Sequence, residues 1–190
     1  MQTWEEGVQD QCVSKELDTL LTALYVLVDD HVVPPRSGRG RRPLFTDSEL
    51  LTVAVAQVLL RFDGERRWIR HVHSDPRWRA LFPHLPRQSG YNKRLRKAEP
   101  LLGKAIWTLA ACCPSWFDDL WITDATPVPC GMSRETVKRS DLAGHAGYGY
   151  CASHSRFYWG LKLYLVCTGD GIPVMWCLAN PKIGERQVLA

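Results

Sequence analysis

The clearest candidate for chemistry in this sequence is one carboxylate, Asp124, which follows the short apolar run at 120–123. Two prolines come soon after it, Pro127 and Pro129. Proline neither continues a helix nor donates a hydrogen bond in a central strand, so the pattern predicts Asp124 at a strand end, on an exposed sheet edge. A carboxylate placed there suits a divalent cation, but an aspartate at a strand end is equally suited to make a turn or a cap.

Basic residues are concentrated in one part of the chain. Residues 34–104 contain sixteen Lys and Arg against six Asp and Glu, whereas residues 1–33 contain one base and seven acids. Most of these cations are arginines, whose planar guanidinium matches phosphate oxygens and guanine edges. The pattern favours a polyanion as the partner of this region, and the recurrence of bases in three separate places favours a nucleic acid. A basic face that is simply solvated is the alternative.

The candidate DNA-binding cations fall into three groups. The first lies in a Gly- and Pro-rich linker at 35–43, which either follows a phosphate backbone or serves only as a tether. The second lies at 65–71 and the third at 89–97. The residues are Arg39, Arg41, Arg42, then Arg66, Arg67, Arg70, and finally Lys93, Arg94, Arg96 and Lys97.

Helical signals dominate the first 115 residues, which form the expected DNA-binding region. Apolar spacing predicts a helix from Ser14 to about residue 31. Thr46 and Glu49 have the spacing of a capping box, which begins a helix that ends near 63–64 and precedes the short basic helix. This is the outline of a helix-turn-helix, although any helical hairpin with a cationic outer face has the same outline. A further helix is expected from Leu101 to about Cys112, with Leu102, Ala105, Ile106, Leu109 and Ala110 as its buried stripe and Lys104 pointing outward.

Residues 116–190 change to the period of strands. Strands are expected at 119–123, 157–168 and 172–179, with a hairpin turn at 169–171, a loop at 132–155 and the start of a helix at 184–190. Trp121, Trp159 and Trp176 lie in these apolar segments and are expected in the core. The fold class is therefore α+β, with a domain boundary near residues 115–119.

Composition indicates a reduced cytosolic protein. The seven cysteines include no Cys-x-x-Cys pair, and the N-terminus has neither a basic nor an apolar segment typical of a signal peptide. Apolar stretches are interrupted well before the ~20 residues that a membrane span needs. No membrane partner is expected.

Several motifs together resemble a known family. They are Asp124-Ala125-Thr126-Pro127-Val128-Pro129, Arg139-Ser140, Tyr158-Trp159-Gly160-Leu161-Lys162-Leu163, Asp170-Gly171-Ile172-Pro173-Val174, Ala179-Asn180-Pro181 and Glu185-Arg186. In order and spacing the sequence resembles the first half of the catalytic domain of DDE transposases from bacterial insertion sequences, preceded by a similar helical DNA-binding region. The resemblance implies an RNase H-like fold of three strands that is incomplete at its C-terminus.

The resemblance also implies a chemistry. Three carboxylates in the intact family hold two Mg²⁺ (or Mn²⁺) ions about 4 Å apart, which cut and join DNA. Asp124 matches the first of these, and Arg139 and Lys162 would contact phosphate. No acid of this chain matches the other two carboxylates, since Glu185 precedes the expected position of the second.

The sequence therefore predicts a truncated or frameshifted copy that does not cut DNA alone. It is expected to be nucleoid-associated, to bind the terminal inverted repeats of an element, and to associate with itself or with a full-length transposase. The alternative is a non-catalytic DNA-binding regulator or inhibitor of transposition.

Overall fold

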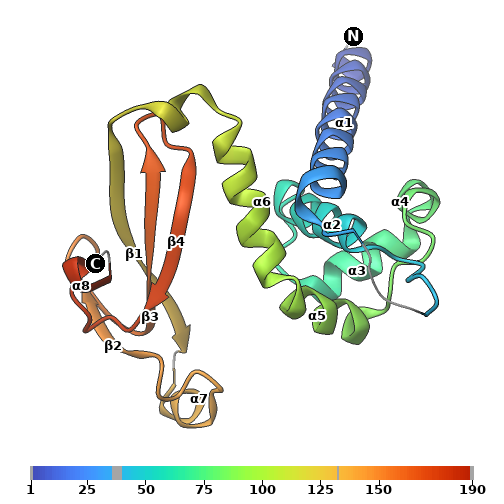
Figure 1. Cartoon of the computed structure of the whole chain (residues 1–190). Coiled ribbons are helices and arrows are strands. Elements are labelled where there is room, and N and C mark those ends of the chain that lie inside the picture. The colour runs from blue at the N-terminus through green and yellow to red at the C-terminus, as the bar shows by residue number, and fades with distance from the viewer. Residues whose placement is uncertain (1, 36–39, 132, 189–190) are drawn as a thin grey trace. The chain divides into compact units, whose positions relative to one another are not determined.

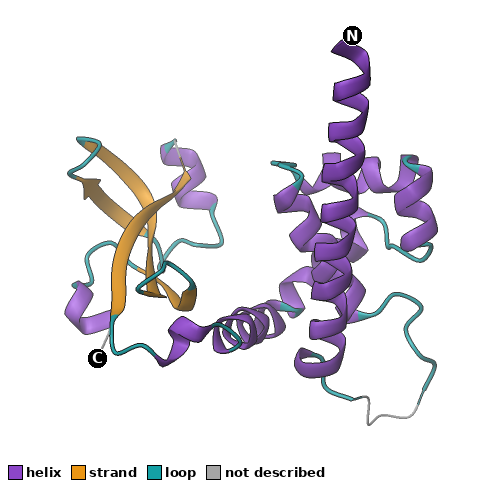
Figure 2. Cartoon of the chain, turned by 90° about the horizontal axis from the view of Figure 1, so that it is seen from above, coloured by secondary structure: helices purple, strands orange, loops and turns teal. Residues whose placement is uncertain are grey.

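The computed structural model describes residues 2–35, 40–131 and 133–188 (Figure 1). The chain divides into two compact units, residues 1–105 and 106–190. The first is helical and the second contains the strands, as Figure 2 shows by colour. The α+β class predicted from the sequence is confirmed. The division between the units lies earlier in the chain than the boundary expected near residues 115–119.

The helical unit consists of consecutive helices joined by short connections. They are α1 (Gln2–Leu27), which continues into a π-helical segment η1 (Val28–Val32), then α2 (Asp47–Leu59), α3 (Glu65–Ser74), α4 (Pro76–Leu81), α5 (Gln88–Lys97) and α6 (Glu99–Ala111), of which the last extends into the second unit. The first helix begins well before Ser14, where its apolar spacing becomes visible. Helix α4 was not predicted from the sequence.

Capping explains where two of these helices begin. The Thr46 hydroxyl accepts a hydrogen bond from the Glu49 backbone N–H (3.1 Å) and the Glu49 carboxylate accepts one from the Thr46 N–H, so the predicted capping box is confirmed. At α4 the Asp75 carboxylate accepts from the backbone N–H groups of Arg77 (2.8 Å) and Trp78 (3.3 Å), with Pro76 in the first turn. Proline is favourable there because its nitrogen would have no helical partner.

The core of this unit is formed by one cluster of buried side chains. Its fully buried members come from η1, α2, α3 and α5, and include Val28, Val32, Leu50, Val53, Trp68 and Tyr91. The Trp68 ring lies 5.0 Å from Phe62 and 5.1 Å from Trp78, measured between ring centroids. Helix α5 packs against both α2 and α3. The core therefore fixes α3 and α5 relative to each other.

Helix α6 confirms the helix predicted near residues 101–112. Ala105 and Ala110 are buried as expected, but Leu109 is exposed, so the predicted stripe is wrong at that position. The Lys104 ammonium donates a hydrogen bond to the carbonyl of Val32 (2.8 Å). None of the described helices is both long enough and apolar enough to cross a membrane.

The second unit is built around one antiparallel sheet of four strands. After a 3₁₀ turn η2 (Pro114–Phe117), its elements are β1 (Trp121–Gly131), α7 (Arg134–Arg139), β2 (Gly147–Cys151), β3 (Arg156–Thr168), β4 (Pro173–Ala179) and α8 (Glu185–Val188). Strand β3 is central, with β1 along one side and β2 and β4 along successive parts of the other. The expected loop at 132–155 is wrong, because it contains α7 and β2, and the sheet has four strands where three were expected.

Strand β1 is longer than the sequence indicated and includes both prolines. Pro127 is opposite Lys162 and Pro129 is opposite Gly160, both in β3. Proline is tolerated in an edge strand where its nitrogen points away from the partner. Asp124 therefore lies within the strand, opposite Leu165, and its expected position at a strand end is wrong. Its predicted exposure on a sheet edge is confirmed.

The hairpin of β3 and β4 confirms the predicted turn at 169–171. Gly171 has a φ of 87°, and its N–H donates to the Thr168 carbonyl (2.9 Å). Among the tryptophans of this unit, Trp159 is 5% exposed, whereas Trp121 and Trp176 are 43% and 37% exposed. The expected core position is therefore confirmed for Trp159 and wrong for the other two.

Candidate nucleic-acid interface

Helix α3 separates apolar and basic side chains onto two faces. Trp68, Ile69 and Val72 are buried in the core of the helical unit. Arg66, Arg67 and Arg70 are exposed on the other side. The helical period produces this separation because residues three and four apart lie on one face. The basic face is therefore a consequence of how the apolar face packs.

The basic face of α3 forms one wall of a groove of about 400 Å³. The other wall is formed by Arg87, the N-cap of α5, and Gln88, the first residue of that helix. The groove is lined by Arg66, Ile69, Arg70, His73 and Ser74 together with Arg87 and Gln88. Arg66 and Arg70 were predicted from the sequence, whereas His73, Arg87 and Gln88 were not. In the sequence, Arg87 was included only in the excess of bases over residues 34–104. Its place beside the residues of α3 depends on the fold, so it could not be predicted.

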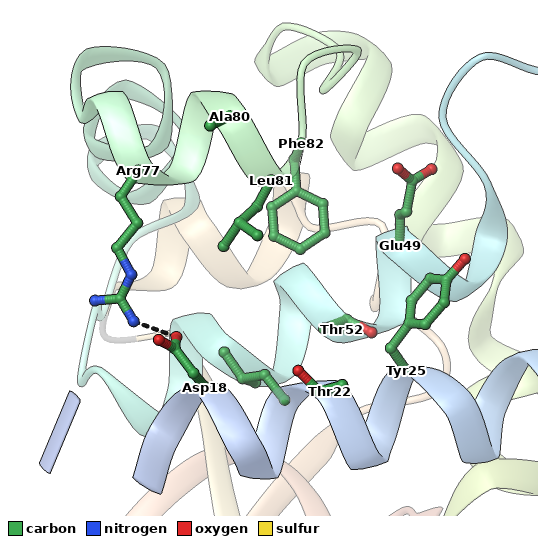
Figure 3. A pocket seen from close by; sticks show the side chains of 10 residues that line it. Asp18, Thr22, Tyr25, Glu49, Thr52, Arg77, Ala80, Leu81 and Phe82 are labelled. Carbon is green, nitrogen blue, oxygen red and sulfur yellow. Dashed lines mark hydrogen bonds and ion pairs between the residues drawn. The ribbon is translucent and has the colours of Figure 1, made fainter. Parts of the chain in front are cut away.

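The cations of this groove are not neutralised by the protein. Within the described residues, Arg66, Arg70 and Arg87 make no ion pair. Arg77 of α4 differs, because it pairs with Asp18 of α1 (Figure 3). Arg67 lies outside the groove, with its guanidinium carbon 5.7 Å from the centre of the Phe62 ring. The groove therefore keeps a positive charge that a phosphate backbone would neutralise.

A second hollow of about 550 Å³ lies where the linker meets α5. Its basic lining residues are Arg41, Arg42, His84, Lys93 and Arg94. Arg94 has partners within the protein: its guanidinium donates to the Phe45 carbonyl (2.6 Å), pairs with Asp47 (2.5 Å) and lies 5.2 Å from the centre of the Phe45 ring. Arg94 therefore holds the start of α2 against α5.

The other predicted contacts are placed as follows. Arg96 and Lys97 are exposed in the last turn of α5, and Arg39 is outside the described residues. Arg139 is exposed on α7, and its guanidinium nitrogen lies 3.6 Å from a carboxylate oxygen of Glu135. Lys162 on β3 has its ammonium 5.7 Å from the centre of the Tyr164 ring.

Asp124 has a local partner rather than a cluster of ligands. Its carboxylate accepts a hydrogen bond from the backbone N–H of Ala125 (2.7 Å) on the edge of the sheet. No three side chains of His, Cys, Asp or Glu come together as possible metal ligands anywhere in the described residues. The donors present do not fit a centre of two Mg²⁺ ions, which needs several oxygen ligands.

The helical unit also has a pocket of about 570 Å³ among α1, α2 and α4 (Figure 3). Leu21, Leu81 and Phe82 provide its apolar surface. Its polar groups already have roles: Asp18 pairs with Arg77, and Glu49 completes the capping box. Burial, followed by the charges of Asp29 and Glu49, raises the pKa of Tyr25. This pocket lacks the positive charge that a nucleic acid requires.

No protein-family model, curated protein or solved structure matches this sequence or its fold.

Proposed function

We propose that this protein binds double-stranded DNA through the α3–α5 groove, defined by Arg66, Arg70, His73, Arg87 and Gln88. The observation that carries the proposal is the set of arginines in that groove without acidic partners among the described residues. Arginine contributes both charge and a planar donor fork, so it contacts phosphates and base edges alike. Gln88 adds an amide, which pairs well with adenine.

The proposal is tested by removing the charge of the groove. Arg66→Gln combined with Arg70→Gln removes two exposed cations and leaves Trp68, Ile69 and Val72 in the core. We expect affinity for a labelled duplex, measured by fluorescence anisotropy at low salt, to fall roughly tenfold or more because two phosphate contacts are lost. The measurement uses the full chain.

A matched control removes the same charge elsewhere on the helical unit. Lys15 and Arg79 are exposed on α1 and α4 and lie outside the groove. The double variant Lys15→Gln/Arg79→Gln should bind duplex within about twofold of the native chain, since only long-range charge changes. Equal weakening by both double variants would mean that net charge, and not this groove, is responsible.

We infer further that the DNA binding serves transposition, in a protein of the DDE family. Two features support this reading. Asp124 lies on a strand next to β3, and β3 forms a hairpin with β4. In the family that the sequence resembles, the first strand carries the first Asp and the next two strands form a hairpin. The excess of bases precedes the sheet in the sequence, as the family's DNA-binding region does. In the intact family the bound metal ions activate the attacking oxygen and stabilise the leaving one.

Asp124 has no cluster of possible metal ligands around it among the described residues, which favours a non-catalytic role for this chain. The purified chain should not nick supercoiled plasmid in the presence of Mg²⁺ or Mn²⁺, and Asp124→Asn should leave duplex affinity unchanged. The alternative reading, a DNA-binding regulator of transposition, requires this same result. Metal-dependent nicking that Asp124→Asn abolishes would show instead that a catalytic centre assembles around this carboxylate, for example from several copies.

A further inference from the structure

Helix α5 has a basic hollow on each side of its first turn. One is the α3–α5 groove, which Gln88 lines. The other is the hollow where the linker meets α5, which we call the linker hollow and which Gly90 lines. Residues two apart on an α-helix lie about 200° apart around its axis. The positions of Gln88 and Gly90 therefore place the two hollows on opposite sides of the helix.

The side of α5 between the two hollows faces solvent. Ser89, Lys93 and Arg96 are exposed there, at the i, i+4, i+7 spacing of one helical face. Tyr91, two positions after Ser89, is fully buried on the opposite side, where α5 packs against α2 and α3 (Figure 1). We call the three exposed residues the outer face of α5.

The cations around α5 are not neutralised by the protein. The helix itself contains no Asp or Glu. Lys93 and Arg96 of the outer face make no ion pair among the described residues, and neither do Arg41 and Arg42, which line the linker hollow. Positive charge is therefore available on both sides of α5, in the two hollows, and along the face between them.

This arrangement matches the major groove of B-form DNA. That groove is about 12 Å wide and admits one α-helix, and the phosphates of the two strands follow its two walls. A helix inserted there needs cations on both sides for the phosphates and polar side chains between them for the base edges. The cations of α3 are placed for one wall, because Arg66 and Arg70 line the α3–α5 groove and Arg67 lies over the Phe62 ring.

We propose that α5 is the helix that enters the major groove, with phosphates of one strand in the α3–α5 groove and phosphates of the other strand in the linker hollow. Ser89, Lys93 and Arg96 then contact base edges. Lysine and arginine pair with O6 and N7 of guanine, so the preferred site contains guanines opposite the outer face.

This inference rests on the proposed binding of duplex DNA and adds the residues that select its sequence. It assigns base contacts to α5 rather than to the basic helix at 65–71, which is the second helix of the outline expected from the sequence.

The test separates sequence preference from charge. The native full chain first selects duplexes from a library of random sequence. Arg96→Lys keeps the charge but removes the planar fork that contacts guanine at two atoms. Affinity of this variant for the selected duplex, measured by fluorescence anisotropy, should fall about fivefold to a hundredfold. Its affinity for a scrambled duplex of the same composition should stay within about twofold. An Arg96→Lys variant that keeps the full preference would contradict the inference.

Two matched variants serve as controls. Arg70→Lys, in the α3–α5 groove, should keep the preference for the selected duplex because lysine still pairs with a phosphate. Arg79→Lys, on α4 and outside both hollows, should change neither affinity. If Arg70→Lys loses the preference and Arg96→Lys keeps it, α3 contacts the bases and the inference is wrong.

A second measurement needs no variant. Methylation of guanine N7 in the selected duplex should block binding of the native chain, because N7 lies in the major groove. Ethylation of phosphates should interfere on both strands, along the two walls of one major groove. Interference by phosphates of one strand only, or by methylation of adenine N3 in the minor groove alone, would overturn the inference.

The remaining outcomes separate this inference from the proposed function. A native chain that binds duplex but selects no sequence from the library would refute the inference alone. A native chain that binds no duplex would refute both.

Discussion

At the scale of single residues, Asp170 shows how one side chain fixes a turn. The Thr168 hydroxyl donates to the Asp170 carboxylate (2.5 Å) and accepts from the Ile172 N–H (3.1 Å). The hydrogen bond from Thr168, followed by that from Ser115, lowers the pKa of Asp170. A lowered pKa in the folded state means that the ionised carboxylate stabilises the fold, so the contribution is present above the ordinary carboxyl pKa of about 4 and is lost as pH falls below it.

Asp170→Asn should therefore destabilise the protein more at pH 6 than at pH 3. The measurement is urea unfolding at both values, with the native chain and the variant compared at each. Asp119→Asn serves as the control, because Asp119 is exposed and lies outside the turn. A difference between native and Asp170→Asn that does not shrink at pH 3 would mean that the carboxylate does not stabilise the turn.

Interactions of single residues were predictable from the sequence where the two partners are close in sequence. The capping box of Thr46 and Glu49 needs only residues three apart, and it was predicted correctly. Arg94 could not be assigned in this way. Its partners are Phe45 and Asp47, nearly fifty positions earlier, so a cation that holds two helices together looked in the sequence like one available for DNA.

At the scale of elements, strand β1 is the feature most dependent on its neighbour. It carries prolines and changes register between Pro129 and Gly131, and β3 adapts to it at Gly160. A Cβ at Gly160 would lie 2.0 Å from the carbonyl oxygen of Val128. Since that oxygen belongs to the backbone, the strands would have to separate to admit a side chain.

Gly160→Ala should lower the free energy of unfolding by about 1–3 kcal/mol, as overpacking does elsewhere. Gly169→Ala is the matched control in the same unit, because a Cβ there would have only ordinary contacts at 3.8 Å. The control should change stability by about 0.5 kcal/mol or less. Urea unfolding of both variants decides the matter, and equal stabilities would show that β1 does not approach β3 as described.

Elements were predictable from sequence when their period was clear. The two faces of α3 and the hairpin of β3 and β4 follow from helical and strand spacing. Strand β2 was missed because alternating glycine resembles a loop, and the reason for those glycines, contact with Asn180 and Pro181, lies some thirty residues away. Strand β1 was predicted too short, because prolines end a central strand but not an edge strand.

At the scale of the whole molecule, basic residues are concentrated in one part of the sequence, and the fold brings some of them together in one groove. The excess of bases in residues 34–104 becomes a groove only because α3 and α5 share one core. Charge counting predicted the region and Arg66 and Arg70, but not Arg87. Asp124 was predicted as a metal ligand from its expected position at a strand end and from the resemblance, but no three possible ligand side chains come together among the described residues.

The most direct test of the central claim is the salt dependence of duplex binding by the full chain and by Arg66→Gln/Arg70→Gln. Neutralised phosphates release counterions, so the logarithm of the binding constant falls with the logarithm of salt concentration by about 0.9 per contact. We predict that the native chain binds with a clear negative slope and that the variant's slope is shallower by about 2. A native chain that does not bind duplex, or a variant whose slope equals that of the native chain, would contradict the proposal that this groove binds DNA.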